Sequence, residues 1–356
     1  MNSILLTGGC GFIGSHTCIC LLEKGYNIII VDSNVNSSPN SLDAIKKIFF
    51  LKEIDIENKL TFYKGDIRDH KFLRDVFKSA IDCNRPINSV VHFAGLKSVK
   101  ESVIHPILYW ENNLIGSINL FRIMEEFKCK NIVFSSSATV YGINNLDLLE
   151  ENMQLKPANP YGETKLAIEK VLENLFHSKK REWRIANLRY FNPIGAHSSG
   201  LLGENPLNVP DNLFPFICKV ASGNLEKLSI FGNDWETKDG TCIRDFIHVM
   251  DLAEAHSAAL DFIFQEDPKF INLNIGTGLG TSVLKLLKTF IKVNKCDVPF
   301  KFCQRREGDV PILIANNKLA LSKLTWKPTR NIVDMCKDGW NWQKLNPNGL
   351  DNKEFS

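Results

Sequence analysis

Tyr161 and Lys165 are the two residues whose types and spacing most directly indicate chemistry. They stand four apart in the stretch Y-G-E-T-K, which opens a segment of helical periodicity, so both side chains fall on one helix face. A phenol has an ordinary pKa of about 10, and lowering it to about 7 takes roughly 4 kcal/mol of added stabilisation of the phenolate. A lysine ammonium and a positively charged nicotinamide ring can supply that stabilisation. The pair therefore predicts a tyrosine that acts as a general base.

Serine hydroxyls come shortly before this pair in the chain. Ser135, Ser136 and Ser137 end a predicted strand, at the edge where doubly wound sheets carry their chemistry. We expect a hydroxyl from this strand end to bond the oxygen that reacts. A lone Y-x-x-x-K usually marks a solvated helix face, but together with the serines and the glycines described next it favours a catalytic site.

Glycines near the start of the chain predict a dinucleotide site. Gly8, Gly11 and Gly14 have the spacing G-x-x-G-x-x-G, between a predicted strand at 3–7 and a predicted helix at 12–24. This spacing permits a tight turn, close approach of a pyrophosphate to the backbone and tight packing of the helix on the strand. The start of the helix then offers free amides to the anion.

The end of the next strand indicates which dinucleotide is bound. Asp32 follows Gly14 by 18 positions, close to the ~20 typical of a carboxylate that holds a ribose 2′-hydroxyl. Residues 33–37 contain no Lys or Arg to neutralise a 2′-phosphate, which favours NAD over NADP. Asp66, after the third strand, stands where it can take the adenine amino group, although a turn-forming Gly-Asp explains it nearly as well.

Strands and helices must alternate to position these residues. Continuous, β-branched apolar runs are typical of strands covered on both faces. Such runs occur at 3–7, 27–32, 60–64, 89–93, 131–135 and 184–190. With helical segments between them, they predict an α/β fold built on a Rossmann-type doubly wound parallel sheet.

The pattern changes after residue 190, which predicts two domains. The NAD-binding Rossmann domain takes residues 1–190 and is rejoined by about 240–270. Shorter and less regular segments at 191–239 and 271–350 predict a smaller α+β substrate-binding C-terminal domain. Residues 351–356 form a polar tail that we expect to fray.

Composition excludes several classes of protein. The 43 basic and 40 acidic residues leave a charge of +3, which offers no footprint for nucleic acid or an anionic membrane. No apolar run reaches the ~18–20 residues of a membrane span, and the start lacks the pattern of a signal peptide. Ten cysteines are too sparse for a disulfide scaffold, and eight dispersed histidines predict no metal. We therefore expect a cytoplasmic protein.

Several longer motifs are similar to those of a known family. They are T-G-G-C-G-F-I-G at 7–14, H-F-A-G-L-K at 92–97, S-S-S-A-T-V-Y-G at 135–142, L-R-Y-F-N-P-I-G at 188–195 and R-R-E-G-D at 305–309. With them the chain resembles the extended short-chain dehydrogenase/reductases, and among these the UDP-glucose 4-epimerases, over nearly its whole length. The resemblance implies an isomerase of galactose metabolism that holds NAD, interconverts UDP-glucose and UDP-galactose through a 4-keto sugar, and forms a homodimer.

The resemblance also implies a role for each site residue. Tyr161 takes the proton of the 4′-hydroxyl, Lys165 binds the nicotinamide ribose and tunes the tyrosine, and Ser137 hydrogen-bonds the 4′-oxygen. The other positions that line NAD are Gly8, Gly11, Phe12, Ile13, Gly14, Asp32, Ser33, Asn34, Val35, Asn36, Ser37, Asp66, Ile67, Phe93, Ala94, Gly95, Lys97, Asn112, Ser135, Tyr190 and Phe191. The UDP-sugar positions, besides Lys97, Ser137 and Tyr161, are Asn192, Asn212, Leu213, Phe231, Arg244, Arg306, Asp309 and Leu313.

Residue chemistry supports some of these roles on its own. The guanidinium groups of Arg244 and Arg306 suit a diphosphate, although either residue alone is more often a surface arginine. Asn192 and Asn212 can bond a sugar hydroxyl or the uracil, and equally serve as ordinary loop residues.

Related reactions make different demands at the serine strand end. Nucleotide-sugar 4,6-dehydratases need an acid and a base there, and UDP-glucuronate decarboxylases carry a Glu. This chain has Ala138 and Thr139, neither of which shuttles a proton at neutral pH, so elimination is disfavoured. Two alternatives remain: a related UDP-GlcNAc/GalNAc 4-epimerase and a non-catalytic NAD-binding sensor. The sensor has no need of the tyrosine, lysine and serine.

Four features leave further expectations. Leu313 is intermediate in size at a position that sets room at the sugar 2′ group, so some turnover of UDP-GlcNAc and UDP-GalNAc is expected beside the main pair. Cys10 in the glycine loop suggests sensitivity to thiol oxidation. The glycines at 274–280 mimic a second nucleotide loop but fit a structural turn better. Helices within 107–127 and 162–175 are expected to form the homodimer interface.

Overall fold

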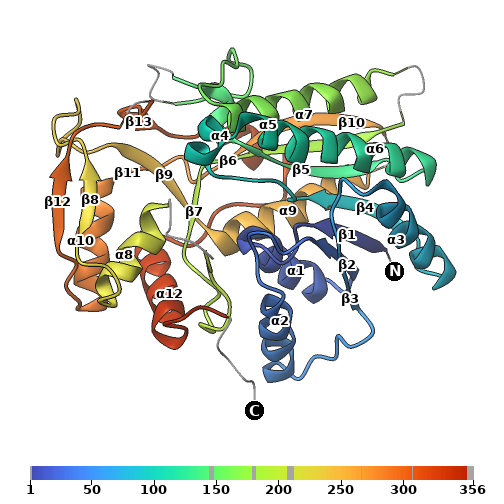
Figure 1. Cartoon of the computed structure of the whole chain (residues 1–356), viewed down its shortest axis with the longest axis horizontal. Helices are drawn as coiled ribbons and strands as arrows, with labels where there is room; N and C mark the ends of the chain where they lie inside the picture. The colour runs from blue at the N-terminus through green and yellow to red at the C-terminus, as the bar shows by residue number, and fades with distance from the viewer. Residues whose placement is uncertain are drawn as a thin grey trace.

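Seven parallel strands form the larger sheet, in the order β10-β6-β5-β4-β1-β2-β3 (Figure 1). This is the Rossmann order with β10 added beside β6, so the predicted fold class is confirmed. The computed structural model describes residues 2–143, 148–178, 182–206, 212–265, 267–306 and 308–350. The strands are β1 (Ser3–Thr7), β2 (Asn27–Asp32), β3 (Leu60–Lys64), β4 (Ile87–His92), β5 (Asn131–Ser137), β6 (Arg184–Tyr190) and β10 (Lys269–Ile275).

Helices cover both faces of this sheet, as the unbroken apolar strands predict. In β1, Ile4 and Leu6 enter one core and Leu5 enters the other, and all three are fully buried. The first core is shared with α1 (Phe12–Glu23), α2 (Asn40–Leu51) and α9 (Val249–Ile263). The second is shared with α3 (His70–Asp82), α6 (Gly116–Glu126) and α7 (Pro160–Phe176).

Short helical segments border the carboxyl edge of the sheet. They are α4 (Val99–Ile104), α5 (Pro106–Tyr109), the π-helix η1 (Trp110–Ile115) and the 3₁₀ turn η2 (Ala138–Tyr141). Asn113 of η1 donates to the Leu96 carbonyl and to Thr164 Oγ1, each at 3.1 Å. It thereby holds the loop after β4 against α7.

The smaller α+β part is drawn on the left of Figure 1. β9 (Ile243–His248) lies at its centre and pairs with β7 (Asn192–Ile194), β11 (Gly280–Ser282) and β13 (Ile312–Leu313). β8 (Leu228–Phe231) and β12 (Phe300–Cys303) form a separate parallel pair. The helices of this part are α8 (Leu213–Ala221), α10 (Val283–Asn294), α11 (Lys318–Lys323) and α12 (Ile332–Leu345).

The chain returns to the larger sheet after β9. α9 packs beside α1, and β10 pairs with β6 over its whole length, from Lys269 opposite Arg184 to Ile275 opposite Tyr190. The return thus extends to Ile275, five residues beyond the expected 270. The tail at 351–356 lies outside the described residues.

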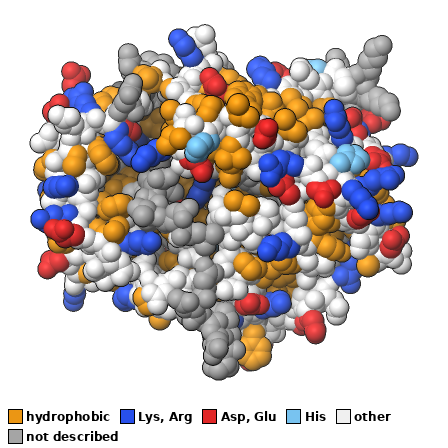
Figure 2. All heavy atoms as spheres, viewed as in Figure 1, with side chains coloured by type: hydrophobic (Ala, Val, Ile, Leu, Met, Phe, Trp, Pro, Cys, Tyr) orange, Lys and Arg blue, Asp and Glu red, His pale blue; other side chains and the backbone are white. Residues whose placement is uncertain are grey.

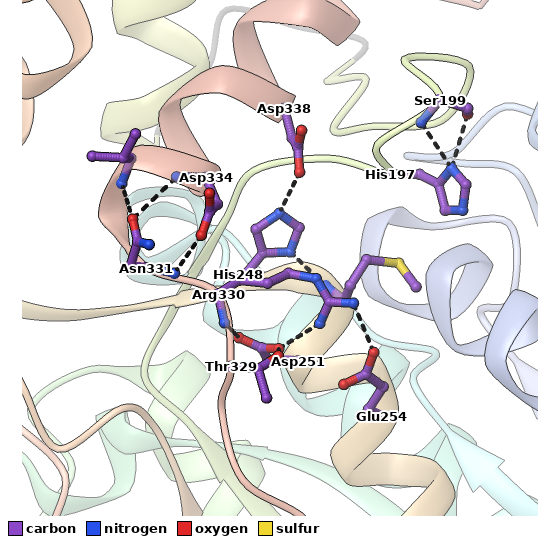
Figure 3. Close-up of polar contacts among 12 residues, drawn as sticks. His197, Ser199, His248, Asp251, Glu254, Thr329, Arg330, Asn331, Asp334 and Asp338 are labelled. Atoms are coloured by element: carbon purple, nitrogen blue, oxygen red, sulfur yellow. Dashed lines mark hydrogen bonds and ion pairs between the residues drawn. The ribbon is translucent and has the colours of Figure 1, made fainter. Parts of the chain in front are cut away.

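Buried charges fasten the returning helix to the C-terminal segment (Figure 3). Asp251, fully buried in α9, accepts hydrogen bonds from the Arg330 backbone at 3.0 Å and from its guanidinium at 2.5 Å. The other arm of the guanidinium donates to Glu254 at 2.9 Å. His248, at the end of β9, contacts Asp338 of α12 at 3.2 Å. Because a buried ion pair is costly to break, these contacts fix β9 and α12 relative to the larger sheet.

The glycine-rich segment 274–280 turns around another buried carboxylate. Asp245 accepts hydrogen bonds from Thr277 N at 2.8 Å, Thr277 Oγ1 at 2.6 Å, Gly278 N at 2.9 Å and Ala315 N at 3.2 Å. The turn leads into β11 rather than directly into a helix. Among the helices of the described residues, none is long and apolar enough to cross a membrane.

Candidate active site

A cavity of about 400 Å³ lies at the carboxyl edge of the larger sheet. Its wall joins residues from both parts of the molecule, and most of the positions predicted from the sequence line it. These are Gly8, Gly11, Phe12, Ile13, Gly14, Asp32, Ser33, Val35, Asn36, Asp66, Ile67, Phe93, Ala94, Gly95, Lys97, Asn112, Ser135, Ser137, Tyr161, Lys165, Tyr190, Phe191, Asn192, Asn212 and Leu213.

The glycine loop forms the floor of one end of the cavity. Gly8 has φ +71°, and a Cβ there would lie 2.7 Å from the backbone nitrogen of Ala94; a Cβ on Gly14 would lie 2.5 Å from the Gly8 carbonyl oxygen. Glycine is therefore required at Gly8 for the turn to pass the loop after β4, and at Gly14 for α1 to approach the end of β1. α1 begins without a side-chain cap on Gly11, which leaves its first amides available to an anion.

Asp32 is held by its neighbours at the end of β2. Its carboxylate accepts hydrogen bonds from Cys10 N at 2.9 Å, Asn34 N at 2.9 Å and Ser37 Oγ at 2.8 Å. Asn34 and Ser37, predicted to line the dinucleotide site, do not reach this cavity wall; they orient Asp32 instead. All three donors are neutral, which leaves the carboxylate its charge for a ribose hydroxyl.

Asp66 lies in the cavity wall but already has a partner. Its carboxylate binds Arg68, with Nη2 to Oδ2 at 2.6 Å, and the Arg68 guanidinium holds the pKa of Asp66 below its usual range. Asp66 would therefore bond an adenine amino group while it remains paired with Arg68.

Ser137, Tyr161 and Lys165 converge on the cavity from β5 and α7. Asn159 caps α7 through Gly162 N at 2.9 Å, so the helix starts immediately before Tyr161. Lys165 Nζ donates to the Ser135 carbonyl at 2.7 Å and lies 5.9 Å from the centre of the Tyr161 ring. β5 extends two residues beyond its predicted end, which brings Ser137 within hydrogen-bonding reach of the tyrosine.

Burial opposes ionisation of both Tyr161 and Lys165. It raises the pKa of the Tyr161 phenol, and the hydrogen bond with Ser137 partly offsets this effect. It lowers the pKa of Lys165 to about 8, against the pull of the Glu169 carboxylate. The lysine is therefore still largely protonated at neutral pH, whereas the phenol needs further positive charge to become a base.

A second cluster of predicted residues lies outside the cavity wall. Asp309 joins two guanidinium groups: it contacts Arg244 Nη2 at 3.5 Å and Arg306 Nε at 3.0 Å. The Arg306 guanidinium stacks 4.8 Å from the centre of the Phe231 ring. Leu313 pairs with Arg244 across β13 and β9. This cluster brings together the cations and the aromatic ring that a nucleoside diphosphate requires. Glu307, in the same motif, lies outside the described residues.

The cavity also contains residues that sequence reasoning left out of the site. Thr139 donates to Ser137 Oγ from its hydroxyl at 3.0 Å, and the serine motif itself could have indicated it. Glu204 links Lys97 Nζ at 3.3 Å to Asn212 Nδ2 at 3.0 Å, and its irregular loop carries no comparable signal. Phe246 lines the cavity and stands two residues after Arg244 on β9. β9 thus runs from the cavity to the second cluster of Phe231, Arg244, Arg306 and Asp309, called the outer cluster below.

Comparisons with known proteins agree on one family. A model of the GDP-mannose 4,6 dehydratase family matches residues 5–339. UDP-glucose 4-epimerase of Bacillus subtilis is 46% identical over 352 residues, covering 99% of this chain and 100% of the relative. An epimerase structure from Stenotrophomonas maltophila, with bound NAD and formylated UDP-arabinopyranose, has TM-score 0.91 and 41% identity over 98% of this chain and 99% of its own. One from Bifidobacterium longum, in complex with NAD+ and UDP, has TM-score 0.89 and 41% identity over 98% and 100%.

Cys10 does not have the surroundings of a reactive thiol. Its side chain is 4% exposed, and burial together with the neighbouring Asp32 charge raises its pKa to about 12. Because the thiolate is the reactive form, the expected sensitivity to oxidation is not supported. Cys83, at the end of α3, is exposed.

Alkylation of the native protein should therefore modify Cys83 rapidly and leave Cys10 intact. Mass spectrometry of peptides after a short exposure to iodoacetamide measures both sites, and the unfolded protein provides the control in which Cys10 reacts. Labelling of Cys10 as fast as Cys83 in the native protein would contradict this assignment.

Proposed function

The chain belongs to the UDP-glucose 4-epimerases, a family of isomerases, and on that premise we propose that it interconverts UDP-glucose and UDP-galactose with NAD as its resident cofactor. The observation that carries the proposal is the convergence of Ser137, Tyr161 and Lys165 on a cavity floored by the glycine loop. All ten cysteines are free, which supports action in the reducing cytoplasm. The proposed substrates place the reaction in galactose metabolism.

The residues of the cavity suit NAD. The uncapped start of α1 and the glycine loop before it line the cavity and leave backbone amides for a pyrophosphate. Asp32 would accept a hydrogen bond from a ribose hydroxyl, and Lys165 would bind the nicotinamide ribose. When bound, NAD supplies the acceptor and then the donor of the C4′ hydride.

Tyr161 is the proposed base. It takes the proton of the 4′-hydroxyl as C4′ is oxidised to the 4-keto sugar, and returns that proton after the sugar has presented its other face. Ser137 is proposed to hold the 4′-oxygen. Its oxygen accepts hydrogen bonds from Thr139, and its proton, which bonds Tyr161, would be shared with the substrate oxygen. Lys165 stabilises the phenolate through its charge.

Outside the cavity, the outer cluster would hold the other end of the substrate. Arg244 and Arg306 bind the diphosphate, and Phe231 packs against the uridine, with Asp309 keeping both guanidinium groups in place. Ala138 is buried and Thr139 is engaged with Ser137, so no acid–base pair stands ready for elimination of water.

Tyr161→Phe should lower epimerase activity by about 10³-fold, because the variant keeps the ring but loses the group that moves the proton. NMR detection of UDP-glucose formed from UDP-galactose, with no NAD added, measures it. NAD released on denaturing each protein shows whether the variant still holds its cofactor. A parent that turns over neither UDP-galactose nor UDP-GalNAc, even with added NAD, would sink the epimerase assignment and favour a non-catalytic NAD-binding protein.

Leu313 is proposed to set substrate breadth. It packs against the apolar cluster that contains Ala138 and Phe191, next to the serine strand end. A side chain of this size leaves intermediate room at the sugar 2′ group, so UDP-GlcNAc and UDP-GalNAc are expected as minor substrates.

Leu313→Tyr should reduce turnover of the N-acetylated pair at least tenfold while leaving UDP-galactose turnover within about threefold, since about 1–3 kcal/mol separates ligands that differ in fit. The ratio of kcat/KM for the two substrates is the measurement. An unchanged ratio would remove Leu313 from the substrate pocket.

An exposed apolar face supports the proposed homodimer. Val103, Ile104, Ile107 and Ile115 on α4, α5 and η1 are 62%, 61%, 71% and 54% exposed. Figure 2 shows hydrophobic side chains gathered in this region, at the upper centre of the view. Ile107 and Ile115 lie within the segment 107–127 in which the interface is expected, and Val103 and Ile104 come just before it. Such a surface is typical of an interaction site.

Val103→Asp with Ile107→Asp should convert the dimer into a monomer, because two charges would be buried at the contact. Light scattering after gel filtration should give twice 40.3 kDa for the parent and 40.3 kDa for the variant. Phe50→Asp, at a residue 79% exposed on α2, is the matched control and should stay dimeric. A monomeric parent would exclude the homodimer.

A further inference from the structure

A buried ion pair that the proposed reaction does not use lies behind the catalytic strand ends. Glu169 of α7 and Arg189 of β6 are 4% and 1% exposed. Arg189 donates to both carboxylate oxygens, from Nη2 to Oε2 at 2.7 Å and from Nε to Oε1 at 3.0 Å. Burying two charges costs several kcal/mol per ion, so stability alone does not explain the pair.

Glu169 lies close to the side chains proposed to act in the reaction. It stands one helical turn after Lys165, and its Oε1 accepts a hydrogen bond from Ser136 at 2.5 Å. Ser136 lies between Ser135, whose carbonyl accepts from Lys165, and Ser137. Glu169 therefore stands on the helix that carries Tyr161 and Lys165, and its carboxylate contacts the strand that carries Ser137.

Arg189 cannot swing away from this position. Its Nη1 donates to Tyr141 Oη and to the Glu151 carbonyl, each at 3.0 Å, and Tyr141 in turn donates to Asn274 at 2.7 Å. The guanidinium is thus held from both sides, and it holds the carboxylate.

The surroundings of Lys165 contain little other charge. The titratable or charged groups that face its ammonium or its partner Glu169 are Tyr161 and Glu169 on α7, Arg189 and Tyr190 on β6, and His92 on β4. Burial keeps His92 neutral, with a pKa lowered to about 3, and raises the pKa of the Tyr190 phenol. Within the described residues, Glu169 is the anion that acts on Lys165.

We propose that Glu169 is a positioning residue which, fixed by Arg189 and Ser136, keeps Lys165 charged and directed at the Ser135 carbonyl. The inference rests on the proposed function, because it assumes that Lys165 assists Tyr161. If the carboxylate loses its charge, the Arg189 guanidinium loses its counter-ion and the effect of burial on Lys165 is no longer offset, so Lys165 releases its proton at lower pH. A neutral lysine no longer stabilises the phenolate.

Glu169→Gln tests this role, because glutamine keeps an oxygen for Arg189 and Ser136 but removes the charge. The fall of kcat/KM on the alkaline side should move down by about one pH unit or more. In the Glu169→Gln holoenzyme, the ultraviolet absorbance of the Tyr161 phenolate should appear at higher pH than in the parent. This absorbance is identified by its absence in Tyr161→Phe.

Two variants serve as controls. Glu173→Gln makes the same change one turn further along α7, at a partly exposed residue paired with Lys170, and should reproduce both curves of the parent. Glu169→Gln combined with Arg189→Met removes both charges, so its alkaline fall should lie between those of the single variant and the parent.

A folded Glu169→Gln variant whose two curves coincide with those of Glu173→Gln would overturn the role and leave a structural ion pair. If the single variant does not fold, the double variant decides, and coincidence with the parent again overturns it. An inactive parent would count against the proposed function instead, and the phenolate titration, which needs no turnover, would still test Glu169.

Discussion

The site depends on an ammonium that stays charged where water hardly reaches it. Lys165 is 4% exposed, and such a charge is tolerated only when polar partners replace its hydration. Those partners are the Ser135 carbonyl, the face of the Phe134 ring and the Glu169 carboxylate beyond. They come from both β5 and α7. Docking of the helix on the sheet removes water from the ammonium and lowers its pKa, and the same docking supplies the polar partners that keep it charged at neutral pH.

Three carboxylates outside the cavity wall hold the smaller part of the molecule together. Asp245 holds the turn after β10, Asp251 anchors the C-terminal segment, and Asp309 joins two arginines. The first two are fully buried and hold their partners rigidly. Asp309 is more open and pairs with two arginines. The smaller part of the molecule thus combines buried, fixed contacts with a more exposed cluster of charges.

Local signals made the larger sheet and much of the cavity predictable. The motifs that predicted the site, namely the glycine spacing, Asp32 and the tyrosine–lysine pair, each involve only a few neighbouring residues. The β-branched apolar strands indicate burial on both faces of the sheet. Local patterns do not show which partner a group takes. The Asn34 backbone and the Ser37 hydroxyl both bond Asp32, and burial raises the pKa of the Cys10 thiol. Glu204 meets Lys97 across 107 positions of sequence, a contact that only the tertiary fold determines.

The late position of β10 in the chain has a consequence for biosynthesis. Until residues 269–275 leave the ribosome, β6 is the edge of the larger sheet and presents unpaired backbone groups to any neighbouring chain. By then β7, α8, β8, β9 and α9 have all been made. The nascent chain therefore cannot complete its first layer before it has produced most of the second. Fragments that stop short of Ile275 expose β6 as an unpaired edge strand, which favours aggregation. The two parts of the molecule therefore fold together rather than in order of synthesis.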